Sequence, residues 1–332
     1  MLRQVAAVFL GGLILSSCAR DPYDPEHDYF SFANSDQFVT RHLDLDLTVD
    51  FDNRQLVGSV RLSMERLDAA ARKLILDSRT LHIEGVSVAL PGGPEQVADF
   101  EIGANDKILG EPLIISLPDG FDPDPAFTAI ISYRTDPSAT ALQWLPPELS
   151  AGGEHPFLFS QSQAIHARSW VPLQDTPSVR ITYTATIRTP PELLAVMSAN
   201  NDPLAARDGE YQFEMPQPIP SYLLAIAAGN LFFAPLGPQT GVYAEPELLS
   251  ASAFEFAETQ QMLDAASAIY GEYQWGRYDL LILPPSFPYG GMENPRLSFI
   301  TPSILAGDRS LVALIAHELA HSWSGNLVSN AT

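Results

Sequence analysis

The chain has 332 residues, of which 46% are hydrophobic and 17% charged, and this composition is typical of a globular protein rather than a disordered one. Its formal net charge of −22 offers no basic footprint for phosphates, which argues against a nucleic-acid partner. Because a chain of this length exceeds what one hydrophobic core usually serves, we expect about two folded domains.

The N-terminus has the layout of a signal peptide. Residues 1–17 carry a basic side chain at Arg3 and then an apolar run, which is too short for a membrane span. The only cysteine, Cys18, follows a Leu-Ser-Ser sequence that resembles a bacterial lipobox. We therefore expect residues 1–17 to be a lipoprotein signal peptide and Cys18 to be lipidated. The alternative is an ordinary signal peptide with an incidental cysteine.

The residue after the cysteine indicates a location. By resemblance to Gram-negative lipoproteins, Ala19 in place of aspartate suggests the outer membrane, with the protein anchored by lipid and facing the periplasm of the bacterial cell envelope. Residues 18–36 are polar and contain two Asp-Pro steps, so we expect the lipidated cysteine and a tether there.

Residues 37–231 have the pattern of a β domain. The segment 42–51 alternates strictly between apolar and polar residues, as a half-buried strand does. Many short strands without intervening helices predict an antiparallel sheet domain. The predicted strands cover residues 42–51, 57–64, 73–76, 81–90, 113–117, 127–133, 179–187 and 222–227.

The composition changes in residues 232–332, where we expect a second, incomplete domain. Apolar residues at helical spacing predict a helix over 251–270, and a short apolar strand is expected over 278–283. A second helix is predicted over 311–323, with Asp308 or Ser310 as its N-cap and Gly325-Asn326 as its end.

That second helix carries the sequence HELAH at residues 317–321. The spacing puts His317 and His321 on one face of a helix, where both can bind one Zn²⁺, and Glu318 lies beside them as the candidate general base. A chance occurrence on a surface helix is the alternative. The flanking residues are apolar nearly all round, which predicts a buried helix, and buried polar side chains require a partner such as a metal ion.

The third ligand separates the subclasses of such sites. A metzincin would need Gly at position 324 and His at 327, where this chain has Ser324 and Leu327. Residues 322–332 contain no Asp, Glu, His or Cys, so we expect the third ligand, a glutamate of the gluzincin type, beyond Thr332.

The sequence YGGMEN at 289–294 suggests a second function, the binding of a substrate. Gly290 and Gly291 allow a substrate backbone to come close to the protein backbone. Glu293 offers a carboxylate that could pair with the free α-ammonium group of a substrate and so direct cleavage to the first residue. The alternative is that the glycines only form a turn.

Residues 152–332 closely resemble the gluzincin zinc aminopeptidases, in the leukotriene A(4) hydrolase and aminopeptidase B branch of the aminopeptidase N superfamily. The matching strings are GEHPFLFSQSQAIHARSWVPLQDTPSV (153–179), QWGRYDLLILPPSFPYGGMENPRLSFITPSILAGD (274–308) and HELAHSWSGNLVSN (317–330). Residues 31–151 match more loosely, mainly through the strand pattern and LILDSRTLHIEGV at 74–86.

The resemblance implies an α+β fold, in which a saddle-like, mostly antiparallel β domain precedes the start of an α-rich, thermolysin-like catalytic domain. It implies His317 and His321 as ligands of one zinc ion per chain, Glu318 as the base, and GGMEN as the exopeptidase loop, in which Glu293 holds the substrate amine.

The family also implies roles for residues outside the zinc helix. Gln163 would hydrogen-bond the substrate backbone, Gln161 would lie by the amine site, and Tyr289 would line the first substrate pocket beside Gly290, Gly291 and Met292. Gln161 and Gln163 are two residues apart, which puts both side chains on one face of the strand that carries Phe157 and Phe159. The alternative is that the two glutamines only form a polar strand edge without a role in binding.

The sequence therefore favours a monomeric zinc aminopeptidase that removes N-terminal residues from short peptides through metal-activated water. One alternative is an inactive fragment or a non-catalytic lipoprotein that lacks the third zinc ligand. Another, less favoured, is epoxide hydrolysis of the leukotriene type.

Overall fold

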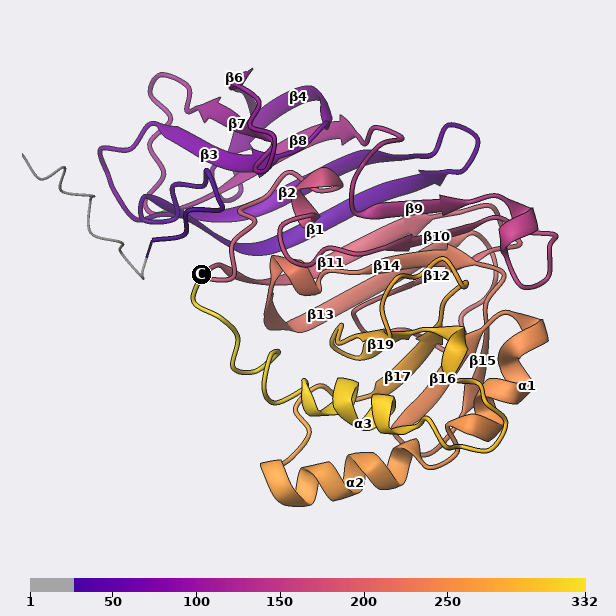
Figure 1. Ribbon diagram of the computed structural model, residues 1–332. Helices are drawn as coiled ribbons and strands as arrows, with labels where there is room; N and C mark the ends of the chain where they lie inside the picture. Colours follow the sequence, from indigo (N-terminus) through magenta and orange to yellow (C-terminus); the bar gives the residue numbers. More distant parts are fainter. Residues whose placement is uncertain (1–26) are drawn as a thin grey trace, which may run out of the picture.

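The computed structural model describes residues 27–332 (Figure 1). The expected signal peptide, Cys18 and the first part of the tether lie outside the described residues. Among the residues described, no helix has both the length and the apolar character needed to cross a membrane.

The largest sheet has seven strands, in the order β13-β11-β1-β2-β8-β4-β5. On β1 the leucines at 43, 45 and 47 are fully buried while Asp44 and Asp46 are exposed, as the predicted alternation requires. Neighbouring strands pair antiparallel, except that β1 pairs with β11 in parallel, which the strand pattern did not predict. Its strands are β1 (Phe38–Asp50), β2 (Gln55–Arg66), β4 (His82–Ala89), β5 (Gln96–Val97), β8 (Ala126–Arg134), β11 (Arg180–Arg188) and β13 (Glu210–Pro220).

Two smaller sheets complete the β-rich part. One has the order β12-β14-β10-β9 and the other β3-β7-β6. The mostly β N-terminal part with few helices matches the predicted fold class. The strands are β3 (Lys73–Ser78), β6 (Asp99–Ile102), β7 (Glu111–Ser116), β9 (Leu142–Leu145), β10 (Phe157–Ser160), β12 (Leu194–Met197) and β14 (Ile226–Gly229), with short 3-10 turns η1 (Pro147–Leu149), η2 (Ala167–Ser169) and η3 (Ser221–Leu223).

The remaining strands form a five-stranded sheet, in the order β15-β16-β17-β19-β18, and all of them follow residue 231. In Figure 1, α2 and α3 run along this sheet, and both α2 and the edge strand β18 contact α3. The division into domains at this residue stays a prediction. The elements are β15 (Phe232–Pro235), β16 (Thr240–Ala244), α1 (Pro246–Glu255), α2 (Thr259–Tyr270), β17 (Tyr278–Ile282), β18 (Gly291–Met292), β19 (Leu297–Ile300), η4 (Pro302–Ile304) and α3 (Ala313–Ala320).

Two predicted elements are wrong. The segment predicted as a single helix over 251–270 contains parts of two helices, because α1 ends at Glu255 and α2 begins only at Thr259. The carboxylate of Glu255 accepts hydrogen bonds from the backbone N–H groups of Gly307 and Arg309, each at 2.8 Å. The strand over 222–227 begins as the turn η3, since Ser221 donates to Asp175 at 2.6 Å, and becomes β14 only at Ile226.

The helix that carries HELAH also differs from its prediction. It begins after Val312 without a side-chain cap, because the Asp308 carboxylate accepts from Ser310 N (3.0 Å) in the turn before it. The helix is not buried all round either: Ile315 and Leu319 are buried, whereas Ala313 and Ala316 are exposed, since within residues 27–332 no segment covers that face.

One connected cluster of buried apolar side chains extends from Phe38 to Leu319. It includes both the seven-stranded and the five-stranded sheet. A direct contact between the two parts is the edge-to-face pair of Phe159 and Phe287, with ring centroids 5.8 Å apart. The β-rich part is therefore packed firmly against the part that carries the HELAH helix.

Candidate metal centre

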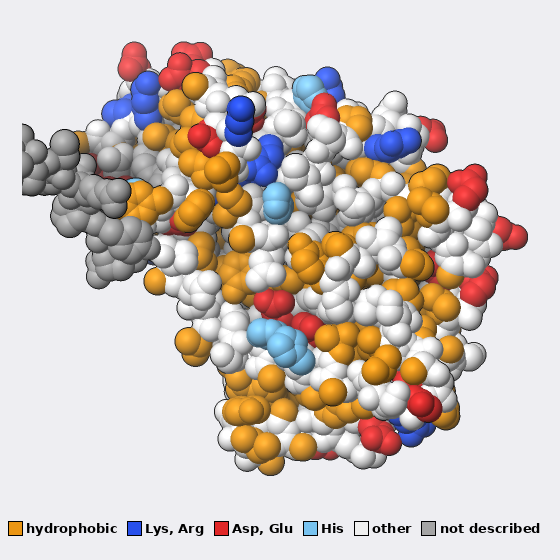
Figure 2. Space-filling model, in the orientation of Figure 1, with side chains coloured by type: hydrophobic (Ala, Val, Ile, Leu, Met, Phe, Trp, Pro, Cys, Tyr) orange, Lys and Arg blue, Asp and Glu red, His pale blue; other side chains and the backbone are white. Residues whose placement is uncertain are grey.

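The imidazoles of His317 and His321 meet on one face of α3. Their Nε2 atoms lie 3.2 Å apart, and the ring planes are 87° from parallel. Two nitrogen ligands at about 2.0–2.1 Å from a tetrahedral zinc ion are about 3.3 Å apart, so this arrangement fits one shared ion. Figure 2 shows a surface patch of histidine side chains in the lower half of the view, with acidic side chains directly beside it.

The second imidazole is oriented by the turn that follows the helix. The Nδ1 atom of His321 lies 3.0 Å from the carbonyl oxygen of Ser324, which can only accept a hydrogen bond. Nδ1 therefore carries the proton, and the Nε2 lone pair is free for a metal ion. Gly325 has φ +134°, and a Cβ there would lie 3.1 Å from this same Nδ1 atom, so the turn leaves little room beside the ring.

Glu318 lies against the GGMEN segment. Its side chain is buried, and its carboxyl group fills the space beside Gly291, where a Cβ would lie only 2.2 Å from Oε1. Burial, and secondarily the nearby Glu293 carboxylate, raises the pKa of Glu318 to about 7. The close approach of the glycine backbone thus places the carboxyl group between the helix and the GGMEN segment.

Glu293 completes the cluster. One ligand atom each from Glu293, Glu318 and His321 lies within 4.8 Å of the others. In the described residues, no lysine or arginine forms an ion pair with either of these glutamates. Two imidazoles and two carboxylates without a protein counter-charge are a donor set suited to a divalent cation such as Zn²⁺.

The other predicted residues are only partly gathered here. Gln161 donates from Nε2 to the sulfur of Met292 at 3.2 Å, which places it beside the GGMEN segment, and its Oε1 is buried without a partner. Strand β10 ends at Ser160, so the prediction that Gln161 and Gln163 lie on a strand face is wrong, and Gln163 is exposed. Of the two glutamines, only Gln161 has a contact with the GGMEN segment in the part of the chain that the structure describes.

Tyr289 and Gly290 begin the YGGMEN segment, ahead of Glu293. Tyr289 is 52% exposed, and its ring packs edge to face on Phe287, with centroids 5.8 Å apart. Phe287 packs in turn on Phe159, so a short aromatic series connects the β-rich part with the start of the YGGMEN segment. A Cβ at Gly290 would meet only the flexible end of Leu314, at 3.2 Å.

Three residues of this site were missed by the sequence analysis. Asn326, predicted only as part of the helix end, is buried and donates from Nδ2 to the carbonyl oxygen of Glu293 at 2.9 Å. Arg180 of β11 and Tyr222 of η3 donate hydrogen bonds to the backbone carbonyl groups of Asn326 and Gly325, in the turn that follows α3. The only sequence signal is an amide side chain directly after the helix-ending glycine, and the partners are too distant in sequence to be inferred from it.

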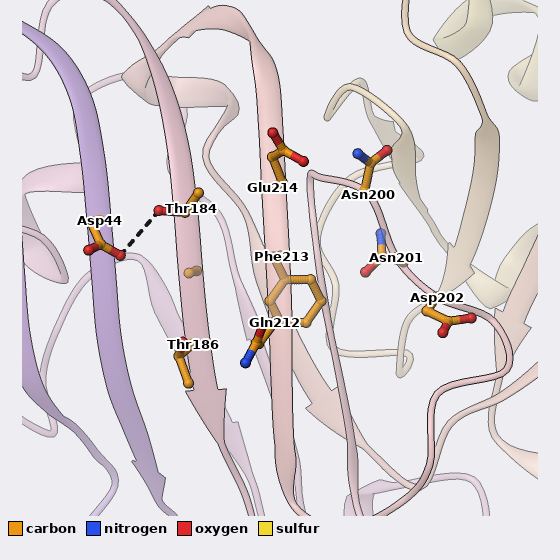
Figure 3. Close-up of a pocket in the computed structure, with 10 residues that line it drawn as sticks. Asp44, Thr184, Thr186, Asn200, Asn201, Asp202, Gln212, Phe213 and Glu214 are labelled. Carbon is orange, nitrogen blue, oxygen red and sulfur yellow. Dashed lines mark hydrogen bonds between the residues drawn. The ribbon is translucent and has the colours of Figure 1, made fainter.

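A surface depression of about 630 Å³ lies elsewhere. Figure 3 shows it along β1, β11 and β13, where Asp44 accepts a hydrogen bond from Thr184 (3.1 Å) and Glu214 lies opposite Asn200. None of the residues that line it belongs to the HELAH or GGMEN segments. Its size therefore does not make it the candidate active site.

Comparisons with known proteins match both parts of the chain. The Peptidase M1 N-terminal domain family matches residues 39–223, and the Peptidase family M1 domain matches residues 254–332. Leukotriene A-4 hydrolase of Xenopus laevis is 47% identical over 310 residues, which cover 92% of this chain and 50% of that protein. Leucine aminopeptidase 2 of Yarrowia lipolytica is 44% identical over 312 residues, 93% of this chain and 46% of that protein.

Solved structures give the same picture. The structure of yeast LTA4 hydrolase in complex with Bestatin superimposes with a TM-score of 0.84 at 42% identity, over 92% of this chain and 47% of that one. An M1 zinc metallopeptidase from Deinococcus radiodurans, at 23% identity and a TM-score of 0.69 over 90% of this chain and 67% of that one, shares the fold. The chain spans about half the length of the curated relatives it matches.

Proposed function

Because this chain belongs to the M1 peptidase family, we propose that it acts as a zinc-dependent aminopeptidase, which hydrolyses the N-terminal peptide bond of short peptides. The observation that carries the proposal is the cluster in which two imidazole Nε2 atoms, 3.2 Å apart, lie next to Glu293 and Glu318. The name of the leucine aminopeptidase relative supports the exopeptidase character.

His317 and His321 hold the zinc ion in this proposal, with one ion per chain. The ion, when bound, supplies Lewis acidity for hydrolysis. The remaining chemistry belongs to side chains. Glu318 accepts a proton from the attacking water at a carboxylate oxygen and delivers it to the leaving amine.

Glu293 determines where the cut falls. Its carboxylate lies within 4.8 Å of the Glu318 carboxylate and the His321 imidazole, so a substrate whose α-ammonium group pairs with it has its first peptide bond beside the base. Gln161 contacts Met292 and extends the polar wall at this end, and the exposed ring of Tyr289 is available to the first side chain of the substrate. Gln163 remains a proposed partner of the substrate backbone.

The test uses chromogenic amino-acid amides, with and without an acetyl group on the α-amine. We expect release only from substrates with a free amine, loss of activity with a chelator, and recovery with zinc. Glu293→Ala should lose most turnover of free-amine substrates while still binding zinc. Chelator-resistant hydrolysis, or equal hydrolysis of the acetylated substrates, would contradict the proposal.

The lipid anchor at Cys18, a periplasmic location at the outer membrane and the monomeric state belong to the same proposal and rest on the sequence alone. Incorporation of labelled fatty acid into the full-length protein in a Gram-negative host, and its loss in Cys18→Ala, would test the anchor. Labelling that persists in Cys18→Ala would refute it.

A further inference from the structure

The turn after α3, residues 322–329, is here called the post-helix loop. Its backbone is closed by hydrogen bonds from Asn326 N to His321 O (3.0 Å) and from Gly325 N to Val328 O (2.9 Å). The carbonyl group that orients the His321 ring, that of Ser324, belongs to this loop. The position of one metal ligand therefore depends on how firmly the loop is held.

Several of the hydrogen bonds that fix the post-helix loop come from side chains of the β-rich part of the molecule. Arg180, at the start of β11, donates from Nη2 to the carbonyl oxygen of Asn326 and from Nη1 to the hydroxyl of Ser329, each at 2.7 Å. Tyr222 donates its hydroxyl proton to the carbonyl oxygen of Gly325 at 3.1 Å. A fourth contact, from Trp275 Nε1 to the carbonyl oxygen of Ser322 at 2.9 Å, fixes the other end.

The same loop reaches the amine-binding segment. The buried Asn326 side chain donates to the main-chain carbonyl of Glu293, while the main-chain N–H of Asn326 donates to the carbonyl of His321. One residue thus connects the backbone of the proposed amine ligand to that of a proposed metal ligand. Its Oδ1 atom is buried without a partner, so its one side-chain bond is to Glu293.

We propose that Asn326 is a positioning residue that fixes Glu293 relative to His321, and that Arg180 and Tyr222 hold Asn326 in place from the β-rich part. The effect on catalysis rests on the proposed function. The coupling between the post-helix loop and the Glu293 segment rests on the contacts alone. Peptide hydrolysis needs the α-ammonium group and the scissile bond at a fixed separation, so Glu293 has to keep its place relative to His321.

The first experiment uses Tyr222→Phe, which removes one hydroxyl group and keeps the ring. Tyr211→Phe is the matched control, because the Tyr211 hydroxyl also donates to a backbone carbonyl, that of Leu193 (2.7 Å), far from the loop in sequence and contacts. Hydrogen exchange is followed in peptides 289–296 and 321–329. We expect Tyr222→Phe to raise exchange about three- to tenfold in both peptides, and Tyr211→Phe to leave both unchanged.

The second experiment asks whether the coupling passes through the asparagine side chain. In an Asn326→Ala background, Tyr222→Phe should still affect peptide 321–329 but no longer peptide 289–296. If Asn326→Ala does not fold, the Tyr222→Phe single variant still decides the coupling. Faster exchange confined to 321–329 in that variant would overturn the proposal.

Kinetics separate positioning from a general loss of structure. A misplaced Glu293 weakens amine binding, so KM for free-amine amides should rise about three- to tenfold in Tyr222→Phe while kcat changes less. A smaller folded fraction would instead lower the apparent kcat at unchanged KM, and this result would overturn the positioning role. If the wild-type protein releases no amino acid at all, the proposed function fails, but the exchange data still decide the coupling.

Discussion

Two groups of acidic side chains in this molecule differ in whether the protein itself supplies a counter-charge. Asp77 and Asp175 are fully buried around Arg168, which donates from Nε to Asp175 at 2.9 Å and lies 3.5 Å from Asp77. Glu293 and Glu318 have no such cation among residues 27–332. In the first cluster the protein itself neutralises the carboxylates, whereas the carboxylates of the second cluster are neutralised only when a cation binds. Clusters of the second kind are the ones that point to function.

The largest effect should come from Glu318→Gln, which keeps the shape of the second cluster and removes its base. We expect a loss of roughly 10²–10⁴-fold in kcat, with the midpoint of thermal unfolding unchanged or raised, because a buried carboxyl group is removed. Glu84→Gln, at an exposed ion pair with Arg134, is the control and should change neither quantity. Retained activity in Glu318→Gln would refute its role as base.

Breaking the first cluster should affect stability instead. Arg168→Met leaves two carboxylates buried without their counter-charge and should lower the free energy of unfolding by about 3–5 kcal/mol. Arg134→Met, at the exposed pair with Glu84, should cost at most about 1 kcal/mol. Urea unfolding measures both. Equal effects would mean that the buried cluster is not the stronger of the two.

Zinc should stabilise the second cluster by supplying the missing cation. At a free zinc concentration of a hundred times Kd, binding to the folded state alone adds about 2.7 kcal/mol to the free energy of unfolding. His317→Ala should lose this gain, while His82→Ala, at an exposed histidine paired with Asp136, should keep it. Zinc-dependent thermal shifts that persist in His317→Ala would place the ion elsewhere.

The smallest effect concerns pH. Burial, opposed by Arg168, raises the pKa of Asp77 to about 6, so the folded state binds a proton more tightly than the unfolded state does. The Asp77 contribution to stability is therefore present at low pH and decreases as pH rises from about 4 to 6. Asp77→Asn should remove this decline, which unfolding curves measured from pH 4 to 7 would show. A steeper decline in the variant would reverse the assigned direction.

The features that could be predicted from the sequence are those that depend on residues close to one another in the chain. The alternation over 42–51 gave β1, and the spacing of His317 and His321 placed both rings on one helix face. Strand β13 shows the same alternation at Tyr211, Phe213 and Met215, but the prolines within it obscured the pattern.

The missed contacts join distant segments. Asn326 meets Glu293 across 33 positions and Arg180 across 146, and no local period reports such pairs. Similarly, the end of β10 at Ser160 and the break after Glu255 depend on tertiary contacts, because in both places the local sequence alone is compatible with a continued element. The motifs therefore predicted which side chains gather at the HELAH and GGMEN segments, whereas the contacts that hold those segments in place could not be predicted.

The single connected core from Phe38 to Leu319 has a consequence for how the chain melts. Sheets that share one core cannot lose their packing independently, so calorimetry should record one endotherm, with equal calorimetric and van 't Hoff enthalpies. The two parts differ in fold class and in proposed role, yet their shared core predicts that they unfold as one cooperative unit. A half expressed alone would expose the apolar side chains, Phe159 or Phe287 among them, that now lie between the two parts.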